Sequence, residues 1–206
     1  MKQLSISCRL LFVLLAPLTL MHCASYSSFQ TAKTLEKGEL SGSVGLGNNY
    51  LGEEPFVDIA LRTGVADDMD VGAKLNVTNY GSSMALVDMK KQLSAGDGPV
   101  YHAVGLGAGF IFSDDKGVAI HLPYYLSLHS ADNLWTFYTN PRALYFIDGD
   151  QEDEFQNTGP GLGSSFGIKV GRKFSLMLEY GFVYGQYDGE NHFNNLLSGG
   201  IGINIK

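Results

Sequence analysis

The sequence predicts an all-β fold: a closed, antiparallel, up-and-down transmembrane β-barrel of about ten strands, with eight or twelve as the alternatives. From about Glu39 to the last residue, apolar residues alternate with glycine or polar residues in segments of about ten residues. Alternation with a period of two is the pattern of a strand with one apolar face. A short apolar segment at the start of the chain indicates export, which a barrel in an envelope membrane requires.

The N-terminus has the form of a cleaved secretory signal. Lys2 and Arg9 accompany an apolar stretch at residues 10–20, which is too short for a spanning helix of about 20 residues. The motif LMHCAS follows, with a leucine three positions before Cys23, as in lipoprotein signals. We therefore expect cleavage before Cys23 and a covalent lipid, such as palmitate, on that residue. His22 occupies a position where such signals usually have a small residue, so ordinary cleavage with an unmodified cysteine is the alternative.

This reading divides the chain into a lipoprotein-type signal peptide (1–22), a polar N-terminal tether (23–38) and one barrel domain (39–206). Cys8 leaves with the signal, so no disulfide framework is possible. The net charge of −7 disfavours nucleic acid as a partner. Mean hydropathy is only +0.01, as expected when half of each strand is polar.

Ten strands are predicted, at 39–48, 55–65, 70–79, 84–93, 101–113, 118–128, 134–146, 160–170, 174–184 and 195–205. In 101–113, the residues from Val104 to Phe112 at even positions should face lipid, and the glycines from Gly105 to Gly109 should face the lumen. The strand at 134–146 is the least regular, because Pro141 interrupts it.

The lengths of the connections predict an orientation. Barrels of this class have short periplasmic turns and longer external loops. If the first strand runs outward, the two longest connections, 147–159 and 185–194, are external, and these external connections are rich in Asp and Glu. An even number of strands then returns the C-terminus to the periplasm. We expect both termini and the lipid on Cys23 to be periplasmic, with the barrel in the cell outer membrane.

Several segments resemble a family of small lipid-anchored outer-membrane β-barrel proteins of diderm bacteria. The resemblance rests on Cys-Ala-Ser followed by FQTAKTLEKGEL, on the hairpin LRTGVADDMDVGAKL, on VDMKKQL and on GPGLGSSFGIKVGRKFSLMLEYGFVYG, and it covers roughly residues 20–206. The resemblance implies a location and an architecture, but no agreed activity. Lys206 departs from many outer-membrane proteins, which end in an aromatic residue.

Charged residues of both signs fall on the predicted lumen face and form the candidate site: Asp58, Arg62, Lys74, Asp88, Lys90, Arg142, Lys169 and Glu179. They can pair across a narrow interior and plug the barrel, or they can form a charged constriction that filters solutes. We favour the plug, because small barrels fill their interiors with side chains.

No other motif indicates chemistry. The sequence from Gly163 to Gly167 matches G-x-S-x-G but continues as strand, whereas a nucleophile elbow needs a helix after the serine. His121, Ser127, His129 and Glu179 are the residues from which an acyl-transfer site would have to be assembled, but His121 and Ser127 are far apart along one strand. The histidines have no metal-ligand spacing. We expect no catalytic residue, no cofactor and no metal, and so no enzyme.

The function predicted is that of an outer-membrane barrel with a structural, surface-interaction or narrow-channel role. Its partners would be outer-membrane lipids, the covalent lipid on Cys23, and a protein partner of unknown identity on either side of the membrane, with no nucleic acid. A lipid-anchored soluble periplasmic barrel that binds an apolar ligand is the first alternative, and it requires the opposite polarity of the two faces. An envelope-lipid-modifying barrel enzyme is the second alternative.

Overall fold

The computed structural model describes residues 27–49, 54–78, 83–94, 98–112, 116–148, 159–187 and 190–205. Within these ranges the chain forms β1 (Leu40–Asn49), β2 (Glu54–Ala66), β3 (Met69–Thr78), β4 (Ser83–Gln92), β5 (Val100–Phe112), β6 (Gly117–His129), β7 (Trp135–Thr139), β8 (Arg142–Asp148), β9 (Gly159–Val170), β10 (Phe174–Tyr187) and β11 (Glu190–Ile205). No helix long and apolar enough to cross a membrane occurs in this part of the chain. The predicted signal peptide and Cys23 lie outside the described residues.

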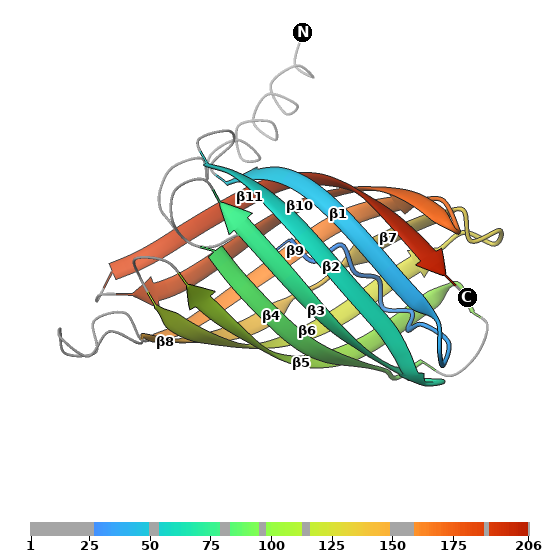
Figure 1. The fold of residues 1–206 in the computed structure, drawn as a ribbon, viewed down its shortest axis with the longest axis horizontal. Coiled ribbons are helices and arrows are strands. Elements are labelled where there is room, and N and C mark those ends of the chain that lie inside the picture. Colours follow the sequence, from blue (N-terminus) through green and yellow to red (C-terminus); the bar gives the residue numbers. More distant parts are fainter. Residues whose placement is uncertain are drawn as a thin grey trace, which may run out of the picture.

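The strands form one closed antiparallel barrel (Figure 1). Successive strands pair with each other, and β1 pairs with β11 from Leu40↔Ile205 to Asn49↔Leu196, which closes the ring. β7 and β8 both lie between β6 and β9, so together they make a single pass through the wall. The barrel therefore has ten passes, and the predicted fold class is confirmed.

The predicted strand at 134–146 is divided in two, at Asn140 and Pro141, because proline has no N–H to donate to the ladder. Pairing nevertheless continues across the break. The Asn140 N–H donates to the Ser165 carbonyl at 2.9 Å, and the Pro141 carbonyl accepts from the Tyr124 N–H at 2.8 Å. The wall thus stays closed where the strand assignment is interrupted.

The predicted facing of the outer wall is confirmed: apolar side chains cover the outside. Small and polar residues face the lumen, together with a cluster of buried apolar side chains formed by Met84, Ala119, Leu144 and Val183. In β5, Val104, Leu106 and Phe110 are 40%, 50% and 56% exposed, whereas Gly107 and Gly109 are buried. Strands β2, β3, β6 and β10 follow the same rule. Their outward residues include Val57, Ile59, Leu61, Leu75, Val77, Leu122, Leu126, Leu176 and Leu178.

We call the end of the barrel where β1 begins and β11 ends the C-terminal mouth, and the other end the far mouth. The prediction of a long loop at 185–194 is wrong. β10 continues to Tyr187 and β11 begins at Glu190, and the two pair up to Tyr187↔Glu190. Backbone pairing thus continues beyond the point where the apolar alternation of the sequence stops. The longest connection at the far mouth is therefore the one between Asp148 and Gly159.

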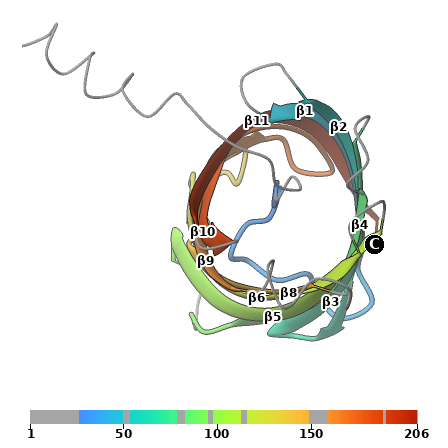
Figure 2. The ribbon, with the colours of Figure 1, turned by 90° about the vertical axis from the view of Figure 1, so that its left-hand side faces the viewer.

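Residues 27–38, which we call the inner segment, pass through the lumen before the chain reaches β1. Figure 2, which looks into the barrel from the far mouth, shows this segment inside the ring of strands. Ser27 and Ala32 are 3% and 0% exposed. At its end, the Gly38 N–H donates to the Gly64 carbonyl at 2.9 Å, at the C-terminal mouth. The sequence pattern predicts a tether for these residues and does not indicate that they lie inside the barrel.

Candidate functional site

The lumen holds an ion-pair network centred on Arg62. Its guanidinium lies 2.6 Å from the Asp70 carboxylate and 2.6 Å from the Asp88 carboxylate, and the Lys90 ammonium lies 3.3 Å from Asp70. All four side chains are 10% exposed or less. They meet because β2, β3 and β4 are adjacent and each residue occupies a lumen position of its strand. Pairing of this kind is what makes several buried charges tolerable in one interior.

A second pair lies nearer the far mouth. The Lys74 ammonium is 3.1 Å from the Asp58 carboxylate, and the side chains are 7% and 2% exposed. The Asn76 amide donates to Asp58 at 2.7 Å. The Ser27 hydroxyl donates to the same carboxylate, and Lys74 donates to the Ser27 carbonyl. The inner segment therefore completes the hydrogen bonding of this pair.

Glu179 in β10 is fully buried and accepts hydrogen bonds from the inner segment. Its carboxylate accepts hydrogen bonds from the Ser28 N–H at 2.6 Å, the Ser28 hydroxyl at 2.8 Å and the Phe29 N–H at 2.9 Å. The Tyr138 hydroxyl also donates to it, at 3.0 Å. Together these four donors satisfy both carboxylate oxygens of Glu179. Without the inner segment, three of these four donors would be gone.

The other half of the inner segment is held by its backbone. The Ala32 N–H donates to the Ser127 hydroxyl at 3.2 Å, and the Lys90 ammonium donates to the Thr31 carbonyl at 2.9 Å. Nearer the C-terminal mouth, the Thr34 N–H donates to the Gln92 side chain at 3.0 Å. Apart from the bridge between Lys37 and Gly64, the described inner segment pairs with no strand, so its N–H and C=O groups have to be satisfied elsewhere, and here the lumen side chains do so.

Glycines in the wall make room for Phe29. A Cβ added at Gly45 in β1 would lie 2.2 Å from a ring carbon of Phe29, and one added at Gly200 in β11 would lie 3.2 Å from the ring. Gly45 and Gly200 are paired across the two strands. The Phe29 side chain of the inner segment therefore packs against the glycine-rich lumen face of β1 and β11.

The structure brings together five of the eight predicted site residues in the pairs described above: Asp58, Arg62, Lys74, Asp88 and Lys90. Glu179 serves the inner segment, and Arg142 is buried in the lumen wall of β8. Asp70, absent from the predicted cluster, is the partner of both Arg62 and Lys90. The period of two could have identified Asp70, because it shares the lumen face with Lys74.

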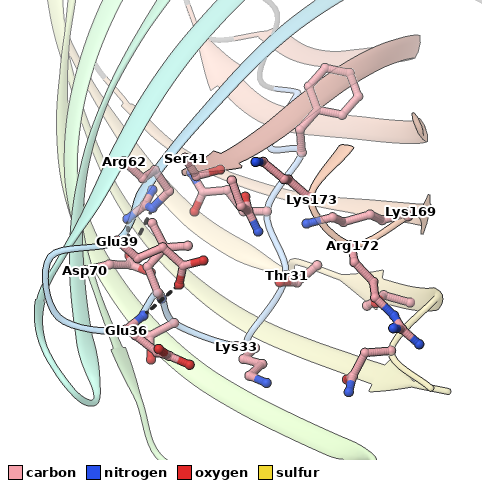
Figure 3. A pocket seen from close by; sticks show the side chains of 18 of the residues that line it. Thr31, Lys33, Glu36, Glu39, Ser41, Arg62, Asp70, Lys169, Arg172 and Lys173 are labelled. Carbon is pink, nitrogen blue, oxygen red and sulfur yellow. Dashed lines mark hydrogen bonds and ion pairs between the residues drawn. The ribbon is translucent and has the colours of Figure 1, made fainter. Parts of the chain in front are cut away.

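Lys169 lies apart from the network, beside a cavity of about 620 Å³ at the C-terminal mouth (Figure 3). The cavity separates the inner segment from the turn between β9 and β10. Its cationic lining residues are Lys33, Arg62, Lys90, Lys169, Arg172 and Lys173, and its acidic ones are Glu36, Glu39 and Asp70. Lys33, Arg172 and Lys173 are exposed, so this end of the lumen is open to water.

Two of the residues considered for acyl transfer are in contact. The Ser127 hydroxyl is 3.0 Å from His129 Nε2, and His129 Nδ1 is 3.2 Å from the Thr136 hydroxyl. Glu179 binds the inner segment instead, and Ser127 is 1% exposed beneath Ala32. The G-x-S-x-G sequence lies within β9 and is strand throughout. Among the described residues, no group of three or more His, Cys, Asp or Glu is placed to hold a metal ion.

No protein-family model matches the chain. No curated protein matches it either. Among solved structures, it is similar to the translocator domain of the autotransporter NalP from Neisseria meningitidis, with 10% identity, coverage of 98% of this chain and 95% of that chain, and a TM-score of 0.44. It is also similar to the N-terminal β-barrel domain of Pseudomonas aeruginosa OprF, with 10% identity, coverage of 83% and 100%, and a TM-score of 0.39. A de novo designed transmembrane β-barrel has 14% identity, coverage of 83% and 98%, and a TM-score of 0.39.

Proposed function

We propose that this chain is an outer-membrane β-barrel lipoprotein whose lumen is closed by its own inner segment, and that its role is structural or in surface interaction rather than in open conduction. The observation that carries this proposal is the position of residues 27–38, which lie in the lumen and hydrogen-bond to its buried charged side chains. A covalent lipid on Cys23 and a periplasmic C-terminus are part of the proposal.

The polarity of the wall supports insertion in a membrane. Large apolar side chains on the outward face of nearly every strand are more than a third exposed. Soluble monomers rarely expose a contiguous apolar patch larger than a few hundred Å². A soluble carrier of an apolar ligand needs an apolar interior, but the interior of this barrel contains charged residues such as Asp58, Lys90 and Glu179. The arrangement favours lipid outside and polar side chains inside.

The connections support the proposed orientation. At the C-terminal mouth, Ala66 to Met69 and Val170 to Phe174 are joined by short turns. The longest connection, between Asp148 and Gly159, is at the far mouth. Short periplasmic turns and longer external loops are the rule for outer-membrane barrels, so we place the C-terminal mouth in the periplasm.

Conductance of the full-length protein in a planar bilayer tests the closed lumen. We expect no current steps above the lipid background, because the inner segment occupies the passage. Folding of the same preparation is checked by a heat-dependent shift in gel mobility, and lipidation by palmitate incorporation that is lost in Cys23→Ala. Ohmic steps from a heat-modifiable wild-type protein would contradict closure. Absence of the mobility shift would contradict the membrane barrel itself.

A further inference from the structure

The cavity at the C-terminal mouth has walls of opposite charge. Its volume of about 620 Å³ is within the range of small-ligand sites in proteins. In Figure 3, Lys169, Arg172 and Lys173 lie on one side of the cavity, and Glu36 and Glu39 lie on the other. We call the side formed by Lys169 of β9 and by Arg172 and Lys173 of the turn between β9 and β10 the basic wall.

The cations of the basic wall lack the carboxylate partners that the deeper cations of the lumen have. Among the described residues, the ion pairs of the lumen involve Arg62, Lys74 and Lys90, and no ion pair includes a residue of the basic wall. Glu39 acts electrostatically on Lys169, but the two side chains are not in ion-pair contact. The basic wall therefore presents positive charge that no described carboxylate neutralises at short range.

Further hydrogen-bonding groups line the cavity beside the basic wall. Thr136 of β7 is the register partner of Lys169, and its hydroxyl is 3.2 Å from His129 Nδ1. Lys33 of the inner segment and Lys169 both lie close enough to His129 to interact with it electrostatically. Asn133, in the turn between β6 and β7, also lines the cavity. Ammonium, hydroxyl and amide groups around one space are donors suited to the oxygens of an anion.

The basic wall is next to the edge of the apolar outer surface. Phe174, which follows Lys173 directly, and Trp135 are exposed on the outward face. The Gly171 N–H donates to the Leu134 carbonyl at 2.8 Å, which joins the two turns that carry these residues. Aromatic side chains gather where the apolar surface of a membrane barrel meets water. An anion can therefore reach the basic wall from the water at this mouth or from the lipid headgroups around it.

We propose that the cavity at the C-terminal mouth binds a phosphate ester that carries hydroxyl groups, with its phosphate on the basic wall. Lysine and arginine are the side chains that most often bind phosphate, and the phosphate would supply the negative charge that the basic wall lacks. Across the cavity, the carboxylates of Glu36 and Glu39 can accept hydrogen bonds from the hydroxyl groups.

Glycerol phosphate has this chemistry, either free in water or as the headgroup of phosphatidylglycerol. The inference goes beyond the proposed function. It requires the barrel, but it requires neither a lipid on Cys23 nor a particular orientation in the membrane.

Binding to the purified full-length protein in a zwitterionic detergent tests the site with two probes. Glycerol phosphate is titrated by calorimetry, and bound phosphatidylglycerol is counted by native mass spectrometry, with phosphatidylcholine as the comparison lipid. We expect at least one of the two probes to bind at one equivalent. Lys169→Gln should weaken that binding at least about tenfold, because it removes a charged hydrogen-bond donor, whereas Lys169→Arg should retain it. Lys91→Gln is the matched control, because this lysine is at the same mouth but exposed, 3.6 Å from Asp68, and should bind like the parent chain.

The two probes distinguish the source of the phosphate. Weaker binding of glycerol phosphate by Lys169→Gln supports a soluble ligand, and a loss confined to phosphatidylglycerol supports a lipid headgroup. The double variant Arg172→Gln with Lys173→Gln, in an exposed turn, repeats the test if Lys169→Gln does not fold.

Absence of binding by both probes would overturn the proposal. Equal binding by the parent chain and the folded basic-wall variants would overturn it too, as would an equal loss in Lys91→Gln. Each variant is compared only if it keeps the heat-dependent mobility shift, so these results leave the barrel intact. Loss of the shift in the parent chain would instead remove the barrel proposed as the function.

Discussion

Substitution of Asp58 tests whether the lumen charges are a coupled, buried network. Asp58→Asn keeps the shape of the side chain and removes the charge that faces the Lys74 ammonium at 3.1 Å. Because the two side chains are only 2% and 7% exposed, water cannot replace the lost partner. Removing one member of a buried ion pair typically costs about 3–5 kcal/mol. Lys74 keeps its hydrogen bond to the Ser27 carbonyl, so we expect the lower end, about 3 kcal/mol.

The assay is urea unfolding of the protein refolded into lipid vesicles, followed by the heat-modifiable gel band. Lys74→Met should also destabilise the barrel, because it leaves Asp58 without its cation. The double variant Asp58→Asn with Lys74→Met should lose less than the sum of the two, by at least about 1 kcal/mol, since neither charge is left alone. Lys91→Met is the matched control: its partner Asp68 is 3.6 Å away, and both side chains are more than half exposed. The control should change stability by less than about 1 kcal/mol.

Strictly additive effects, or a cost of Asp58→Asn no greater than that of Lys91→Met, would refute this reasoning. Either result would mean that water reaches the pair and that the lumen is not closed at the level of Ser27.

Two further substitutions test the packing of Phe29 against the barrel wall and the contact of the outward face with lipid. Gly45→Ala should displace Phe29, because the new Cβ would lie 2.2 Å from its ring. The assay is disulfide formation between Ser28→Cys and Ser165→Cys in a Cys23→Ala background, since the two serine hydroxyls are 3.1 Å apart. Gly45→Ala should lower the crosslink yield several-fold, and Gly199→Ala, whose new Cβ would be 3.7 Å from its nearest neighbour, should leave it unchanged; equal yields would contradict the packing of Phe29 against Gly45. Leu61 is 57% exposed on the outward face of β2. Leu61→Arg should lower the free energy of unfolding in vesicles by about 2–4 kcal/mol, and Leu61→Ala should lower it clearly less. An arginine that leaves the free energy of unfolding unchanged would mean that this face lies in water.

The wall of the barrel could be predicted from the sequence because its determinants are local. A strand exposes alternate residues on opposite faces, so the alternation within each segment predicts which of its side chains face lipid and which face the lumen. Val104, Leu106 and Phe110 point outward, and Gly107 and Gly109 inward, as this period requires. The errors occur where backbone pairing does not follow the sequence pattern. The hairpin at 185–194 stays paired up to Tyr187↔Glu190 although the apolar alternation has stopped, and Pro141 breaks a strand assignment without opening the wall.

The same period limited the candidate site to a set of lumen positions, but it could not say which charges meet. Arg62 pairs with Asp70 and Asp88 because neighbouring strands have a particular register, and no local pattern specifies that register. Lys169 has the same facing as the network residues, yet it lies across the cavity at the C-terminal mouth from Arg62 and Asp70, which line the same cavity (Figure 3).

By itself, then, the sequence determined a barrel with an apolar outside and a charged, glycine-rich inside. Only the tertiary structure decided what fills that inside. The inner segment has no period of its own, and its main contact joins Ser28 to Glu179, 151 positions along the chain. Its unpaired backbone groups and the buried charges of the lumen both require hydrogen-bond partners, and each supplies them to the other. These groups come together only after the barrel has closed, so no local pattern predicts the position of the segment.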